Sequence, residues 1–342
     1  MTDGPVIRRF DSSNGARIYR IPMTVFPNGF VGYAYVVLGI SSPLLVDTGS
    51  GFGSSNDDLL AGIAALKTEF NEPVTVRDIK RILITHGHID HFGGLAFMVE
   101  QTGARVGIHA LDRRVLTNYE ERVGVATKDL LVYLDRAGIS PERRQNLIDM
   151  YSFGKQHFNS IPVDFSLDED IPFEGGMRFI HTPGHCPGQV CILIGDVLLS
   201  ADHVLSHTTP HQAPESITRY MGLGHYRDAL RKLLPYADRI RVTLGGHEEP
   251  IHNLSQRITE ILVSHERKVD RVLDILRAAG RPLTTAEITD TMYPERKGYD
   301  ELLALEEAGA HIEYLYERGF ISLANLADVE TDANPPLEYV LS

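Results

Sequence analysis

The chain has 342 residues, of which 43% are hydrophobic and 23% charged, proportions typical of a folded globular protein rather than a disordered one. Its formal net charge of −13 disfavours functions in which a polyanion binds across the whole surface. With 15 His but only 2 Cys, the sequence excludes a disulfide framework and favours imidazole and carboxylate chemistry.

The N-terminal sequence MTDGPVIRRF has an early acidic residue and lacks the apolar stretch of a secretory signal, so we expect a cytoplasmic location. The longest uncharged run, residues 21–46, is interrupted by Pro, Gly and Asn. It is therefore more typical of two strands and their turns than of a membrane helix, and no membrane partner is expected.

The hydrophobic pattern predicts a β-rich beginning, a mixed middle and a helical end. Strands at both ends of the first 262 residues, with helices between them, favour an α/β fold in which helices cover two sheets. Residues 111–160 are helical and charged, which predicts an inserted helical lobe. In chain order, we expect short strands within 16–47, a helix at 57–70, a strand at 81–85, a helix at 93–102 and strands at 105–109, 177–181, 189–194, 196–200 and 239–244.

Two local signals refine this outline. The pair Gly195-Asp196 between CILI and VLLS predicts a tight β-hairpin. After residue 265 the pattern changes to three helices followed by two strands, which is the order of a winged helix-turn-helix unit. We therefore predict a catalytic domain over 1–262 and a small winged-helix-like domain over 263–342.

The strongest chemical signal is the segment THGHIDH, which follows the apolar strand RILI and precedes a Gly-Gly pair. It places His86, His88, Asp90 and His91 within six residues. A tight loop at the end of a strand can direct these side chains into one space, where imidazole nitrogens and carboxylate oxygens bind divalent metals. A loop of solvated histidines is the alternative, and the density of ligand-type residues argues against it.

Further ligand candidates follow other predicted strands. His185 lies in the rigid turn TPGHCPG, Asp202 follows the second hairpin strand, and His247 follows RVTLGG. Each feature is weak alone, but their common position after strand ends makes the set informative. Cys186 and Cys191 are most simply interpreted as core thiols.

The order of LLVDTG, THGHIDH, TPGHCPGQ, SAD and GGH resembles the metallo-β-lactamase-fold hydrolases over residues 17–260. The resemblance implies an αββα sandwich with a metal site at the edge between its sheets. It implies one metal bound by His86, His88 and His185, a second bound by Asp90, His91 and His247, a bridging carboxylate from Asp202, and Asp47 as the residue that braces the His loop. The tail resembles the small winged-helix domain of the branch that includes β-lactamase-like protein 2.

Such a ligand set predicts hydrolysis without a Ser or Cys nucleophile. Two divalent ions lower the pKa of a bound water to about 7, so a metal-bound hydroxide can attack a carbonyl or phosphoryl group, with Asp90 holding its proton. The nitrogen and oxygen ligands suit Zn²⁺, Fe²⁺ and Mn²⁺ alike, and Zn²⁺ is our first expectation. His88 stands where flavodiiron oxygen reductases carry Glu, which argues against a redox role.

Three functions are compatible with the sequence: hydrolysis of a small ester, thioester or lactone; cleavage of single-stranded RNA; and DNA binding by the tail. Residues 265–342 contain 8 basic and 16 acidic residues, a net charge of −8, which disfavours the nucleic acids because phosphate binding needs a basic face. We therefore expect a small-molecule substrate and no duplex DNA partner. The tail is interpreted as a packing or homo-oligomerisation module, and His225 and Tyr226 as candidate substrate contacts.

Overall fold

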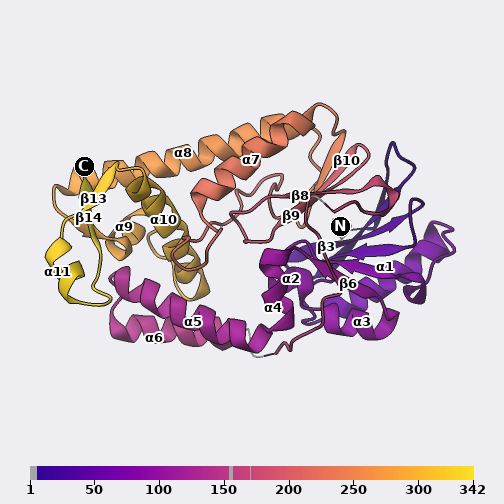
Figure 1. The fold of residues 1–342 in the computed structure, drawn as a ribbon, viewed down its shortest axis with the longest axis horizontal. Helices are drawn as coiled ribbons and strands as arrows, with labels where there is room; N and C mark the ends of the chain where they lie inside the picture. Colours follow the sequence, from indigo (N-terminus) through magenta and orange to yellow (C-terminus); the bar gives the residue numbers. More distant parts are fainter. Residues whose placement is uncertain (1–5, 154–156, 170) are drawn as a thin grey trace. The chain divides into compact units, whose positions relative to one another are not determined.

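The computed structural model describes residues 6–153, 157–169 and 171–342, which form two compact units (Figure 1). Unit 1 comprises residues 1–118, 160–210 and 229–258, and unit 2 comprises residues 119–159, 211–228 and 259–342. Each unit has its own core and is described separately.

The first sheet of unit 1 has seven strands in the order of the sequence. Its first four strands are antiparallel neighbours, whereas β4 to β7 run parallel. The carboxyl ends of these parallel strands therefore lie at one edge of the sheet. The strands are β1 (Arg8–Asp11), β2 (Arg17–Thr24), β3 (Val31–Leu38), β4 (Leu44–Val46), β5 (Arg81–Leu83), β6 (Arg105–Ile108) and β7 (Phe165–Ser166).

The second sheet of unit 1 has four strands in the order β11-β10-β9-β8. The predicted hairpin is present: Ile194 pairs with Val197, and Gly195 has a positive φ of 58° that suits the tight turn. The strands are β8 (Arg178–His181), β9 (Val190–Ile194), β10 (Val197–Ala201) and β11 (Val242–Gly245).

The core of unit 1 lies between the two sheets. Aliphatic and aromatic residues of β3, β4 and β5 share one buried cluster with those of β8 to β11, including Tyr35, Val46, Phe179, Ile192 and Leu199. Helix α1 contacts β2. The helices within this unit are α1 (Ser55–Glu69), α2 (Ile89–Phe92), α3 (Leu95–Thr102) and α4 (Arg113–Thr117), with 3₁₀ turns at Val76–Asp78, Ala110–Asp112 and Glu174–Gly176.

The expected helix-covered pair of sheets is confirmed. The short strands β1 and β7 were not predicted from the sequence. β1 alternates little between buried and exposed residues, and β7 has only two residues, so neither carries a clear period-two pattern.

Truncating the core between the sheets should destabilise unit 1. Leu199 in β10 is 1% exposed, so Leu199→Ala is expected to lower the free energy of unfolding by about 2–5 kcal/mol, through lost burial and an unfilled cavity. Leu234→Ala is the matched control, because Leu234 is 39% exposed and should change stability by roughly 0.5 kcal/mol or less. Urea unfolding of both variants measures the difference, and equal losses would contradict this assignment of the core.

Unit 2 combines the tail with residues that the sequence places far from it. The expected three helices and two strands of the tail are present, together with β12 and α11, and the strands form a sheet in the order β12-β14-β13. The winged-helix resemblance of this unit stays a prediction. Its elements are α5 (Tyr119–Arg136), α6 (Pro141–Phe153), α9 (Thr285–Met292), α10 (Tyr299–Glu317), α11 (Leu326–Thr331), β12 (Leu283–Thr284), β13 (Ile321–Leu323) and β14 (Glu338–Leu341).

The compact units do not coincide with the predicted boundary at 262/263. Helices α5 and α6, expected as a lobe inserted in the catalytic domain, share a buried cluster with tail residues such as Leu302 and Leu305. Tyr133 of α5 also donates a hydrogen bond to the carbonyl of Leu305. Unit boundaries further fall inside α7 (Leu223–Ala237) and α8 (Leu254–Ala279), so the domain division drawn from the sequence stays a prediction.

Among the residues that the structure describes, no helix has the length and apolar character needed to cross a bilayer.

Candidate metal centre

The predicted ligands lie in unit 1, and most of them follow the end of a strand. His86, His88, Asp90 and His91 come after β5, where the chain turns through a loop into the short helix α2. The other three each come shortly after the strand that precedes them in the chain: His185 after β8, Asp202 after β10, and His247 after β11. The structure brings all seven together in two groups that share Asp202.

The first group consists of His86, His88, His185 and Asp202. Nε2 of His86 lies 3.1 Å from Nδ1 of His88, and Nε2 of His185 lies 3.8 Å from Oδ2 of Asp202. Burial, together with the nearby His185, lowers the pKa of His88 to about 3. Its imidazole is therefore neutral near pH 7, which is the form that binds metals.

The second group consists of Asp90, His91, Asp202 and His247. Nε2 of His247 lies 3.2 Å from Oδ2 of Asp90 and 3.5 Å from Oδ2 of Asp202. Burial alone would raise the pKa of Asp90, but the imidazoles of His91 and His247 outweigh it and lower that pKa to about 2. Asp90 is therefore an ionised carboxylate, as a metal ligand must be.

The donor atoms fit divalent metal ions. Nε2 of His91 and Oδ1 of Asp202 are buried and have no hydrogen-bond partner among the described residues, although they lie only 3.4 Å apart. Buried polar atoms of this kind are costly unless something binds them. Cys186 belongs to neither group, and both cysteines are buried free thiols, as expected. The ligands are then all nitrogen and oxygen, which suits Zn²⁺, Fe²⁺ and Mn²⁺.

Asp47, which the resemblance implies as the residue that braces the His loop, contacts that loop at three points. Its Oδ1 accepts a hydrogen bond from the backbone N–H of Thr85, and its Oδ2 contacts both Oγ1 of Thr85 and Nδ1 of His91 at 2.8–2.9 Å. The second imidazole of that group, His247, is held in a similar way: its Nδ1 lies 2.8 Å from the carbonyl oxygen of Val31. These contacts fix the rings so that Nε2 of each faces the centre.

A further carboxylate, Asp112, connects the two loops of the first group. Its Oδ2 accepts from the N–H of Gly87 at 2.9 Å, and its Oδ1 accepts from the N–H of Gly188 at 2.8 Å. Gly87 separates His86 from His88, and Gly188 lies three residues after His185. Asp112 was not predicted from the sequence, because a single Asp in a helical segment carries no motif. Its position shortly after β6, at the same sheet edge as the His loop, is the signal that could have found it.

Replacing Asp112 should loosen the first group. In Asp112→Asn, one carboxylate oxygen becomes an NH₂ group that cannot accept a hydrogen bond, so one loop loses its partner. We expect metal affinity to fall by roughly 10–100-fold, the usual effect of removing a group that orients metal ligands. Competition with a chromophoric chelator measures this, and Asp168→Asn is the control, because Asp168 makes a similar bond to a backbone N–H at a more exposed site. Equal affinities of both variants would refute this role.

The backbone beside the ligands is strained in three places. Asp47, Ala201 and Glu248 have positive φ angles of 60°, 45° and 65°, which residues other than glycine rarely adopt. The pairing of β10 with β11 also shifts between Leu199 and Ala201, a bulge that precedes Asp202. Strain of this kind is typical of functional sites, where the surrounding structure enforces it.

The two candidate substrate residues lie in unit 2, on α7. Tyr226 is completely buried, with its ring 5.4 Å from that of His265. His225 is more exposed, and its Nε2 lies 3.2 Å from a carboxylate oxygen of Glu215. Their role toward a substrate stays a prediction.

A family model described as the metallo-beta-lactamase superfamily matches residues 27–265. The chain belongs to this superfamily. A crystal structure of a metallo-beta-lactamase family protein from Thermus thermophilus aligns with a TM-score of 0.72 and 26% identity, covering 95% of this chain and 98% of that one. It therefore matches the described fold over nearly its full length.

Curated relatives of this metallo-beta-lactamase superfamily chain include a probable metallo-hydrolase of Bacillus subtilis, 32% identical over 37% of this chain and 46% of the relative. An atrochrysone carboxyl ACP thioesterase of Aspergillus fumigatus is 24% identical over 71% of this chain and 58% of the relative. The chain thus spans about half the length of these relatives. Within this superfamily chain, the two ligand groups are the candidates for holding metal ions.

Proposed function

We propose that the chain is a dinuclear metal-dependent hydrolase that cleaves an ester, thioester or lactone of a small molecule. The observation that carries the proposal is the sharing of Asp202 by two adjoining ligand groups. Two divalent ions held there, for which Zn²⁺ is our first choice, would supply a nucleophile from water at neutral pH and polarise the substrate oxygen. No Ser or Cys nucleophile is then required.

The residues of the chain have distinct tasks in this proposal. Asp47 and Asp112 hold the ligand loops in place, so that the site is formed before substrate binds. Asp90 is ionised and within 3.2 Å of His247, so its carboxylate can hold a proton of the attacking water. Asp202 supplies a carboxylate to both groups.

The surroundings of the second group favour an acyl substrate. The Phe30 side chain is 44% exposed, and its ring centroid lies 4.5 Å from that of His247. An exposed aromatic ring beside the ligands offers apolar surface to the organic part of a substrate. The thioesterase name of one relative supports the same class of substrate, because a thioester carbonyl is an acyl group.

A hydrolysis screen tests the proposal. Metal-loaded protein is assayed with aryl esters, acyl thioesters, lactones, phosphodiesters and single-stranded RNA, before and after removal of metal by a chelator. We expect turnover of at least one acyl substrate that chelation abolishes and added Zn²⁺, Fe²⁺ or Mn²⁺ restores. Turnover of RNA alone would overturn the small-molecule assignment, and turnover that survives complete metal removal would overturn the metal dependence.

A further inference from the structure

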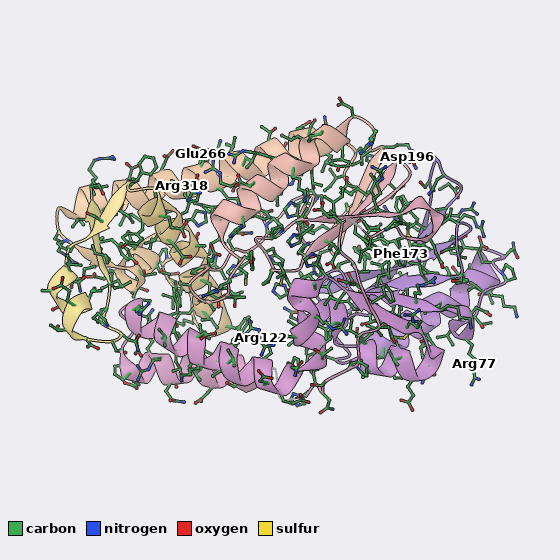
Figure 2. All side chains as sticks on the ribbon, in the orientation of Figure 1. Arg77, Arg122, Phe173, Asp196, Glu266 and Arg318 are labelled. Atoms are coloured by element: carbon green, nitrogen blue, oxygen red, sulfur yellow. The ribbon has the colours of Figure 1, made fainter. Side chains whose placement is uncertain are left out.

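A second cluster of potential metal ligands lies in unit 2, whereas the metal centre described above lies in unit 1. It consists of His265 on α8 and of Glu307 and His311 on α10, one helical turn apart. His265 and His311 are 0% exposed and Glu307 is 7% exposed. Glu266, the next residue of α8, is labelled in Figure 2. It is exposed, and its Oε2 lies 3.0 Å from Nη2 of Arg227. Helix α8 thus turns His265 away from solvent.

The two helices that carry the cluster also contribute to an apolar core. Val272, Ala308, Ile312 and Leu315, on the same two helices, belong to the buried hydrophobic core of unit 2. Placing two imidazoles and a carboxylate in such a core costs free energy unless each polar atom is satisfied. The cluster therefore needs a physical reason that packing alone does not supply.

The hydrogen bonds make the ring nitrogens converge. Nδ1 of His311 lies 2.6 Å from the carbonyl oxygen of Glu307 and must donate to it, so Nε2 of His311 carries a lone pair when the ring is neutral. That lone pair faces Nδ1 of His265 at 3.0 Å. Nε2 of His265 has no hydrogen-bond partner in the described parts of the chain. The polar contact of the His265 ring is therefore the one that its Nδ1 makes with His311.

This spacing is close to that of two ligands on one metal. Two nitrogens bound tetrahedrally at about 2.1 Å are roughly 3.4 Å apart, so a shift of a few tenths of an ångström would admit an ion. His265, Glu307 and His311 each offer one ligand atom that lies within 4.8 Å of those of the other two. Two His and one Glu are the three protein ligands of a well-known class of zinc site, in which a water takes the fourth position.

Outer contacts hold the carboxylate in place. Nζ of Lys268 lies 2.6 Å from Oε1 of Glu307, and the backbone N–H of Gln212 donates to Oε2 at 2.8 Å. The backbone of Glu307 also orients His311, as described above. In metal sites, the protein typically also hydrogen-bonds the ring nitrogens and carboxylate oxygens that do not face the metal, and this orients the ligands. The net charge of −8 over residues 265–342 further favours a bound cation.

We propose that His265, Glu307 and His311 bind a divalent transition-metal ion of the Zn²⁺ class, which joins α8 to α10 within unit 2. The site lies in unit 2 and shares no residue with the metal centre of unit 1. Its ion would be the third of the chain.

Metal analysis of the purified full chain tests this. Protein depleted by chelation is reloaded with Zn²⁺, and in a second series with Co²⁺, and bound equivalents are measured by mass spectrometry after removal of free metal. We expect three equivalents in the wild type and two in His265→Gln and in His311→Gln. His225→Gln is the control, since His225 is a more exposed histidine of the same unit outside the cluster, and it should keep three. Equal stoichiometry in the wild type and both cluster variants would overturn the proposal.

If the cluster variants do not fold, a variant of the metal centre in unit 1 tests the same proposal. The triple substitution His88→Ala, Asp202→Ala and His247→Ala leaves only two ligands in each group of the metal centre of unit 1 and changes no residue of unit 2. We expect it to retain one equivalent of Co²⁺, with absorption bands of a site containing only nitrogen and oxygen ligands. Complete loss of Co²⁺ would overturn the third site. Because no readout depends on turnover, failure of this proposal is distinguishable from failure of the proposed hydrolase function.

Discussion

His88→Ala is expected to lower kcat/KM for the acyl substrate by about 10³-fold or more, equivalent to ~4 kcal/mol of transition-state stabilisation. The reason is that His88 supplies one of three imidazoles to the first ligand group, and no other described side chain of that group can replace it. Asp90→Ala should have a similar effect through the second group, because it removes both a ligand and the carboxylate that can hold a proton. Steady-state kinetics with metal-loaded protein measure both losses.

The control for these variants is a histidine outside the ligand groups. His181→Gln is suitable, because Nε2 of His181 contacts only the carbonyl oxygen of Pro187 among the polar contacts that the structure gives its ring. We expect its kcat/KM to stay within roughly a factor of ten of the wild type. Retention of full activity by His88→Ala, above all in metal-depleted protein, would contradict the dinuclear interpretation.

Gly246→Ala is expected to disrupt the metal centre without removing a ligand. A Cβ at this position would lie 2.5 Å from Oδ1 of Asp202 and 2.5 Å from Cε1 of His91. Real contacts are never this short, so both side chains must move, and both belong to the second group. We expect metal affinity to fall by about 100-fold, at the upper end of what misplaced ligands cost, and turnover to fall with it.

Titration of metal-depleted Gly246→Ala with Co²⁺ measures that loss. Gly124→Ala is the matched control, since nothing lies within 4 Å of a Cβ built there and its φ is not in the left-handed region. Alanine also favours the helix in which Gly124 lies, so metal binding should be unchanged and stability slightly higher. Normal affinity in Gly246→Ala would mean that Asp202 and His91 are not both ligands.

Much of the fold could be predicted because its patterns are local. The β-branched and aromatic enrichment of β2 and β3, the Gly195-Asp196 turn and the apolar face of α1 each depend on neighbouring residues, and all of these elements are present. The assignment of α5 and α6 to the catalytic domain followed from their place in the sequence. Their shared core with Leu302 and Leu305 could not be read from the sequence, because contacts between residues so far apart in the chain leave no periodic signal.

The metal centre was accessible from sequence for a related reason. His86 to His91 are adjacent in the chain, and His185, Asp202 and His247 each follow a recognisable strand, so topology alone collects them at one edge. Asp112 acts through backbone N–H groups, which every residue has, and therefore no residue pattern marks its partners. The cluster of His265, Glu307 and His311 was missed because it needs two helices to meet, and helix packing is not readable from either helix alone.

The bulge in β10 makes the length of that strand part of the chemistry. Successive side chains of a strand point to opposite faces, so the extra residue between Leu199 and Ala201 decides whether Asp202 faces the histidines or the opposite side. A one-residue deletion there would keep every ligand in the sequence. It would nevertheless turn the Asp202 side chain, which both groups share, to the opposite face of the sheet. Counting motifs in a relative therefore does not suffice to infer an intact centre: the spacing from GD to SAD must be preserved as well.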